Sequence, residues 1–189
     1  EGVSHLVAET ATVLSEAYLG IGQVHSARDL ARKNPTWNES QQLVMTADLA
    51  DKVQQRIEKR IFHARATLEK GLAILEKELT APVTATASHS MASEIRAFAA
   101  KLDASGRMAL VRKAINEGDE LVAGSILGGP AFLSGLEDET LKTFTRMWRE
   151  RINPEASQRV KVMAAANELL ADRHKLLAGE LEKAVGAAP

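Results

Sequence analysis

Residues 39–80 read ESQQLVMTADLADKVQQRIEKRIFHARATLEKGLAILEKELT, and this stretch constrains the fold more strongly than any other. It contains no proline and a single glycine, Gly71. At the ~1.5 Å rise of an α-helix, its roughly 42 residues would extend for ~60 Å, several times the length of an average globular helix. Helices this long usually form the spines of bundles, coiled coils or elongated assemblies. The stretch therefore predicts architecture and no active site.

Two patterns run along this predicted helix. The apolar residues from Ile57 to Leu79 recur with a period close to ~3.67, which predicts a straight or slightly right-handed apolar seam. A basic stripe accompanies the seam and comprises Lys52, Arg56, Lys59, Arg60 and Arg65. Residues 1–51 carry seven acidic and three basic side chains, so we expect the stripe to face solvent or this acidic segment, in the same copy or in a neighbouring one.

The composition favours an all-α fold. Alanine and leucine dominate, aromatic residues make up only 4%, and no β-branched run alternates with period two. Lys and Arg number 24 against 25 Asp and Glu, which is an ordinary balance for a globular chain. The absence of cysteine excludes disulfide frameworks, thiolate metal sites and cysteine nucleophiles.

The segments around the long helix suggest two domains. Residues 3–19 have helical periodicity with Tyr18 among the apolar positions, and we expect Gly20 and Gly22 to interrupt the helix before a shorter one ends at Asn34-Pro35. Thr36 or Asn38 can cap the long helix. Residues 81–90 are small, polar and marked by Pro82, which predicts a linker. We therefore expect an elongated N-terminal helical hairpin over 1–80, a linker at 81–90 and a C-terminal helical domain over 91–189.

The C-terminal half predicts a bundle of shorter helices and one long final helix. Caps and breakers place helices from Ser90 or Ser93 to Leu102, after Ser105 to Gly118, from Asp119 to Leu127, from 137 to 152, and from Pro154 to about Val185. In the last helix, apolar residues follow a heptad seam in which Asn167 and His174 occupy equivalent positions.

The two seams are the candidate interaction sites. A polar residue in an apolar seam can specify register or oligomer number, so a self-pairing C-terminal helix is one interpretation. Packing inside the chain's own domain is the alternative that the pattern favours, because intramolecular bundles show the same spacing. The candidate interface residues are Leu68, Leu72, Leu75, Leu79, Asn167, Leu170, His174, Leu177 and Leu181.

Residues 146–151 read RMWRER and offer an alternative function. Arg146, Arg149 and Arg151 around Trp148 could hold phosphate and stack a base. However, residues 117–139 are acidic and contain no lysine or arginine, and the whole chain is nearly neutral. Nucleic-acid binding normally needs a larger uncompensated positive surface, so we favour the interpretation in which Trp148 lies in a core.

No motif predicts an enzyme. Residues 124–130 have the glycine density of a phosphate loop but lack its lysine and hydroxyl residue, and they predict a helix terminator. The acidic run 137–139 is typical of the first turn of a helix. His5 with Glu9, and His25 with Asp29, lack a third metal ligand nearby. We expect no catalytic residues, no metal and no cofactor.

Residues 94–185 contain GRMALV at 106–111, ILGGP at 126–130, FLSGL at 132–136 and RINPE at 151–155. Together these words resemble small helical proteins encoded by proteobacterial prophages and tailed phages. The resemblance implies a virion component or an assembly factor, located in the virion or in the cytoplasm of a bacterial host, and it carries no functional residues over.

The expected function is therefore that of a non-enzymatic structural or interaction protein that oligomerises or docks through helical surfaces. Its expected partners are further copies of the chain or other subunits of an assembly. No run approaches the ~18 apolar residues of a membrane span, and the N-terminal residues do not resemble a signal peptide, so no membrane association is predicted.

Overall fold

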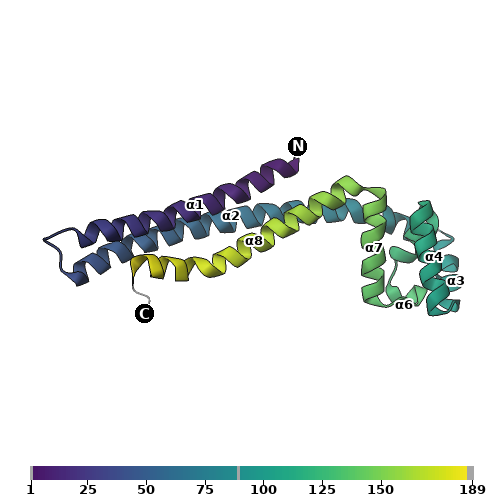
Figure 1. Cartoon of the computed structure of the whole chain (residues 1–189). Coiled ribbons are helices and arrows are strands. Elements are labelled where there is room, and N and C mark those ends of the chain that lie inside the picture. Colours follow the sequence, from purple (N-terminus) through teal and green to yellow (C-terminus); the bar gives the residue numbers. More distant parts are fainter. Residues whose placement is uncertain (1, 89, 187–189) are drawn as a thin grey trace. The chain divides into compact units, whose positions relative to one another are not determined.

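The computed structural model describes residues 2–88 and 90–186, and all regular elements within them are α-helices (Figure 1). The predicted all-α fold is confirmed. The helices are α1 (Gly2–Arg32), α2 (Glu39–Ala87), α3 (Ala92–Lys101), α4 (Ala104–Glu117), α5 (Glu120–Leu127), α6 (Ala131–Ser134), α7 (Asp138–Ile152) and α8 (Pro154–Val185). None of them is long and apolar enough to cross a membrane.

The chain forms two compact units. Unit 1 comprises Glu1–Gly71 and Val162–Pro189, and unit 2 comprises Leu72–Lys161. This division differs from the domains expected at 1–80 and 91–189, because the C-terminal part of α8 joins the N-terminal hairpin. The long helices α2 and α8 each contribute one part to each unit.

Helix α2 continues seven residues beyond its predicted end, so residues 81–87 are helical and do not form the predicted loop. Pro82 lies inside the helix and removes one backbone donor. The helix nevertheless continues because Val83 is buried in the core of unit 2. The threonine hydroxyls are compatible with a helix, since Thr84 and Thr86 each donate to the carbonyl four residues earlier, at 3.1 and 3.0 Å.

Helix α1 is also continuous, so the interruption predicted at Gly20 and Gly22 is wrong. A helix-interior glycine costs only about 1 kcal/mol relative to alanine, which packing can offset. A Cβ on Gly20 would lie 2.7 Å from Cγ1 of Val53, so this glycine allows α1 to approach α2 closely.

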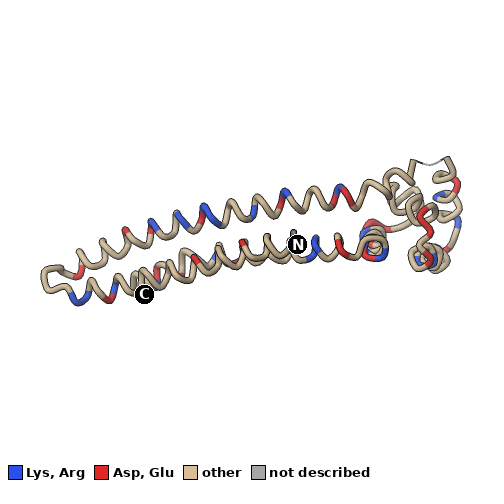
Figure 2. Tube along the Cα trace, turned by 90° about the horizontal axis from the view of Figure 1, so that it is seen from above, with Lys and Arg blue, Asp and Glu red and all other residues tan. Residues whose placement is uncertain are grey.

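In unit 1, α1 and the matching parts of α2 and α8 run side by side (Figures 1 and 2). Asn38 caps α2 as predicted: its Oδ1 accepts from the backbone N–H of Gln41 at 2.9 Å, while its own N–H donates to the Gln41 side chain at 3.0 Å. The core of the unit is made by Val13, Val24, Ala31, Ala50, Val53, Ile57, Ile61, Ala64, Leu68, Met163, Ala166, Leu170, Leu177, Leu181, Ala184 and Val185.

Unit 2 is built around α5, whose residues 123–127 are all buried. Asp119 caps this helix by accepting from the backbone N–H of Val122 at 2.9 Å, and Gly118 ends α4 with a φ of 73°. Both features were predicted from the sequence. The core of the unit comprises Val83, Ala99, Val111, Ala114, Ile115, Ala123, Ile126, Leu127, Ala131, Leu136, Phe144 and Trp148.

Candidate interaction surface

The apolar residues of the predicted interface largely face the chain's own cores. In unit 1, Leu68, Leu170, Leu177 and Leu181 are between 0% and 4% exposed. In unit 2, Leu79 is buried, while Leu72 and Leu75 are half-buried. These side chains have the environment of an intramolecular bundle, the alternative that the spacing also allowed.

The two polar seam residues lie at the edge of the α2–α8 contact in unit 1. Asn167 Oδ1 accepts a hydrogen bond from Nε of Arg65 at 2.9 Å, and Arg65 forms an ion pair with Glu69 at 3.3 Å. His174 is exposed, with its Nε2 3.9 Å from a carboxylate oxygen of Glu58. Both residues thus have partners on the neighbouring helix of the same chain.

One residue of the basic stripe of α2 pairs with the acidic segment that we expected the stripe to face. Arg60 Nε lies 3.1 Å from the carboxylate of Glu16 on α1, within the same unit. Lys52 and Lys59 are exposed on the outer side of α2.

The arginine and tryptophan cluster on α7 is divided between core and surface. Trp148 is 2% exposed and packs with Phe144 in the core of unit 2, where no base can stack on it. Arg149 donates to the hydroxyl of Thr80 on α2 at 2.7 Å. Arg146 and Arg151 are exposed. The structure therefore does not assemble the aromatic and cationic platform that the sequence suggested.

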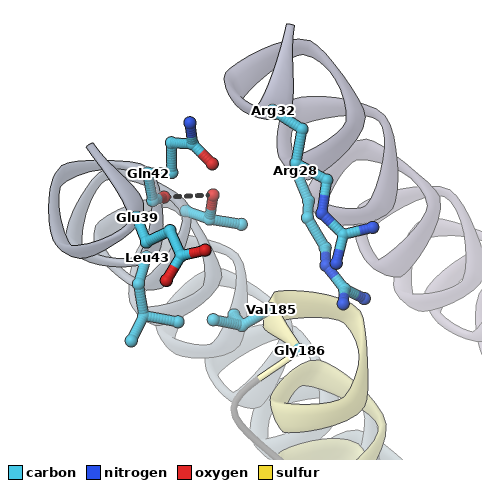
Figure 3. Close-up of a pocket in the computed structure, with 8 residues that line it drawn as sticks. Arg28, Arg32, Glu39, Gln42, Leu43, Val185 and Gly186 are labelled. Atoms are coloured by element: carbon cyan, nitrogen blue, oxygen red, sulfur yellow. Dashed lines mark hydrogen bonds between the residues drawn. The ribbon is translucent and has the colours of Figure 1, made fainter. Parts of the chain in front are cut away.

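A surface pocket of about 550 Å³ lies at the end of unit 1 where α8 terminates (Figure 3). Arg28 and Arg32 of α1 form one wall, and Glu39 of α2 points into the same space. The guanidinium of Arg28 packs against Gly186, which follows the last residue of α8. Cations are favoured at a helix C-terminus, so this arrangement stabilises the end of α8 and needs no ligand.

The outer side of α1 is the surface that sequence reasoning missed. We define the α1 face as the exposed residues Ser4, Ala8, Ala11, Ser15, Tyr18, Leu19, Gly22 and Ser26. Tyr18 is 79% exposed and Leu19 62%, although Tyr18 belongs to the apolar positions that recur at helical spacing. The face contains no charged residue over about six turns.

The outer sides of the other two helices of unit 1 carry many charged residues, together with the exposed apolar side chains of Phe62 on α2 (78%) and Leu176 on α8 (54%). On α8, Lys175 pairs with Asp172 at 2.9 Å, and Lys183 with Glu180 at 2.8 Å. Figure 2 shows charged residues recurring along α2. The α1 face therefore differs from these charged stretches, because it contains no charged residue. The low charge of α1, with five charged residues among 31, is the sequence feature that could have indicated this uncharged surface.

Exposed apolar side chains continue at the α1–α2 turn. Leu30 is 69% exposed, and Val44 and Met45 at the start of α2 are 57% and 51% exposed. Trp37, in the turn, lines shallow pockets next to them. Together with the α1 face, these side chains give unit 1 a large exposed apolar surface, which on a folded protein usually marks an interaction site.

No groups of three or more histidine, aspartate or glutamate side chains in the described residues are arranged to hold a metal ion. No protein-family model matches the chain, and neither the characterised proteins nor the solved structures include a significant match.

Proposed function

We propose that this chain is a non-enzymatic structural protein that self-associates, or docks into a larger assembly, through an exposed helical surface of unit 1. The observation that carries the proposal is the α1 face, which is uncharged and leaves Tyr18 79% and Leu19 62% exposed. Leaving such side chains in water gives up the ~1.5–3 kcal/mol that burying each of them would contribute. A partner helix on this face would recover that free energy.

The resemblance of residues 94–185 to prophage and tailed-phage proteins supports an assembly as the setting, such as a phage particle. Nucleic-acid binding is the weaker proposal, because Trp148 is buried and Arg149 is bonded to Thr80. A salt-dependent shift of DNA or RNA that Arg151→Glu abolishes would revive it.

The proposal is tested by placing two charges on the α1 face. Ala8 and Ala11 are exposed, so Ala8→Lys with Ala11→Glu leaves the core of unit 1 unchanged. A matched control is Ala165→Lys with Ala178→Glu, which puts the same substitutions at two exposed alanines of α8. Sedimentation velocity from ~1 to ~200 µM spans the range in which weak interfaces associate.

We expect the wild-type chain and the α8 control to form species larger than a monomer, or to remain bound in the native assembly, and the α1 variant to be released as a folded monomer. The proposal fails if the wild-type chain is monomeric throughout this range and bound in no assembly. It also fails if the α1 variant associates as well as the control does.

A further inference from the structure

A glycine on the α1 face has no role within the chain. Glycine in a helix interior is unfavourable, so it usually marks a close approach. Gly20 fits this rule, because a Cβ there would contact Val53. Gly22 does not: a Cβ on it would meet nothing within 4 Å, and its φ is not positive. Nothing in the fold therefore requires a glycine at position 22.

The residues around Gly22 suggest that this glycine serves in packing against a helix from outside the chain. Tyr18, one turn earlier on the same face, is a large and almost fully exposed side chain, and Ser15 and Ser26 on either side are small. A bulky residue beside a gap is the arrangement by which one helix packs into another. Small residues at the crossing also bring two helices closer together.

We infer that the partner is a second copy of this chain, an inference that rests on the proposed function. The α1 helices of the two copies pack antiparallel through their α1 faces, with Tyr18 of each copy over Gly22 of the other. This contact is isologous, as expected for a two-fold dimer. The α1 face contains no charged residue between Ser4 and Ser26, so two copies meet over this part with no like-charge pair, and only Asp29 beyond its end meets an uncharged residue of the other copy. A charged partner would lose hydration on this face without gaining an ion pair.

The charge at the end of the face selects the antiparallel orientation. In a parallel pair in register, Asp29 would lie beside Asp29 of the other copy, and Tyr18 would face Tyr18. In the antiparallel pair, Asp29 lies opposite Ala11, so the two Asp29 carboxylates are separated by ~27 Å along the axis, well beyond the ~10 Å screening length.

The size of the contact predicts a weak dimer. With Tyr18 opposite Gly22, the two helices overlap over residues 8–32, a length of ~37 Å, and a helix ~10 Å wide gives a projected footprint of ~370 Å² per copy. This is less than the ~800 Å² per partner of a standard stable interface. We therefore expect micromolar dissociation, which must be measured at high protein concentration.

The first test uses the matched glycine pair of unit 1. Gly179 lies inside α8 with nothing within 4 Å of a Cβ, near the charged residues Asp172 and Lys175. Leucine is a better helix former than glycine, so both Gly22→Leu and Gly179→Leu should keep the folded chain at least as stable to heat. Only Gly22→Leu is expected to raise the dimer dissociation constant, by ~10-fold or more, because overpacking opens the crossing.

The second test reads the orientation. The chain has no cysteine, so single cysteines report unambiguously. Disulfides need Cα atoms within ~7 Å. An Ala11→Cys chain, which keeps Asp29, should therefore form little 11–11 disulfide in a redox buffer, because the two positions 11 of an antiparallel pair are ~27 Å apart along the axis. A parallel pair in register would instead give the 11–11 product readily and would overturn the inference.

The outcomes separate this inference from the proposed function. If the wild-type chain self-associates but Gly22→Leu and Gly179→Leu dissociate alike, the Tyr18–Gly22 contact is overturned and the proposed function stands. If the wild-type chain stays monomeric and loses a different, identified subunit on Ala8→Lys with Ala11→Glu, the second copy is overturned while docking stands. A monomer that binds no subunit overturns both.

Discussion

Arg107 connects three helices of unit 2 and offers the sharpest test of how that unit is held together. Its Nε donates to the carbonyl of Ala99 at 3.0 Å, and its Nη2 donates to that of Leu102 at 2.8 Å, at the end of α3. Its Nη1 donates to the carbonyl of Gly135, which follows α6. The last carbonyls of a helix have no partner within the helix, so one side chain of α4 satisfies the ends of two others.

We expect Arg107→Met to destabilise unit 2 by ~2–4 kcal/mol. Hydrogen bonds from a charged donor contribute ~1.5–3 kcal/mol each. Water can hydrogen-bond the more exposed carbonyls once the guanidinium is removed, so the expected loss of stability is smaller than the sum over all of the arginine's bonds. Methionine keeps an unbranched apolar stem, so the packing of the arginine's methylenes is largely retained.

The measurement uses the two tryptophans, one in each unit. Trp148 lies in the core of unit 2 and Trp37 in unit 1, so urea unfolding of a Trp37→Phe background follows unit 2 by fluorescence. With a slope of ~1–3 kcal/mol/M, the midpoint should fall by ~1–2 M. Arg112→Met is the control, because Arg112 is exposed on the same helix. A change below ~0.5 kcal/mol, or one equal to that of the control, would refute the reasoning.

Three further predictions follow from the cores and from one ion pair. Leu170→Ala, at a fully buried position in unit 1, should cost ~2–5 kcal/mol in urea unfolding, and a loss below ~1 kcal/mol would contradict the assigned burial. A Cβ on Gly124 would lie 2.6 Å from Cβ of Thr86, so Gly124→Val should cost ~1–3 kcal/mol, and a neutral effect would mean that α2 and α5 are not so close. The hydrogen bond from Lys161 holds the pKa of the Glu150 carboxylate below its usual value. Any stability that this ion pair contributes is therefore fully present above the usual pKa and is lost as the pH falls through the lowered pKa. NMR titration of Lys161→Ala should show the pKa rising towards normal, and an unchanged pKa would exclude Lys161 as the cause.

Structural features that depend on neighbouring residues were predicted better than features that depend on residues far apart in the chain. The ends of α5 and α8 were predicted well because a cap or a proline acts within a few residues, as at Asp119 and Pro154. The predictions at Gly20 and at residues 81–87 failed because local helix breakers were outweighed by packing against distant residues. Val53 packs against Gly20, and the core of unit 2 buries Val83.

The surfaces were harder to predict than the helices. The spacing of Leu170, Leu177 and Leu181 identified one apolar stripe of α8, but a stripe has the same pattern whether its partner belongs to the same chain or to another copy. The sequence favoured a core position for Trp148, and this prediction is confirmed, but the helices that pack over the indole could not be read from the sequence. Tyr18 was counted among the apolar positions of α1, but periodicity alone could not tell whether it faces the core or the surface.

Propensity, capping and composition are properties of a residue and its neighbours, so the sequence predicted a helical chain, the ends of most helices and the absence of cysteine chemistry. Which apolar residues are covered depends on packing between segments that are far apart in the chain. In the folded structure the end of α8 joins the N-terminal hairpin, the chain's own helices cover the seams, and the α1 face stays exposed. The exposure of the candidate interaction surface is therefore a product of the fold and has no local pattern in the sequence.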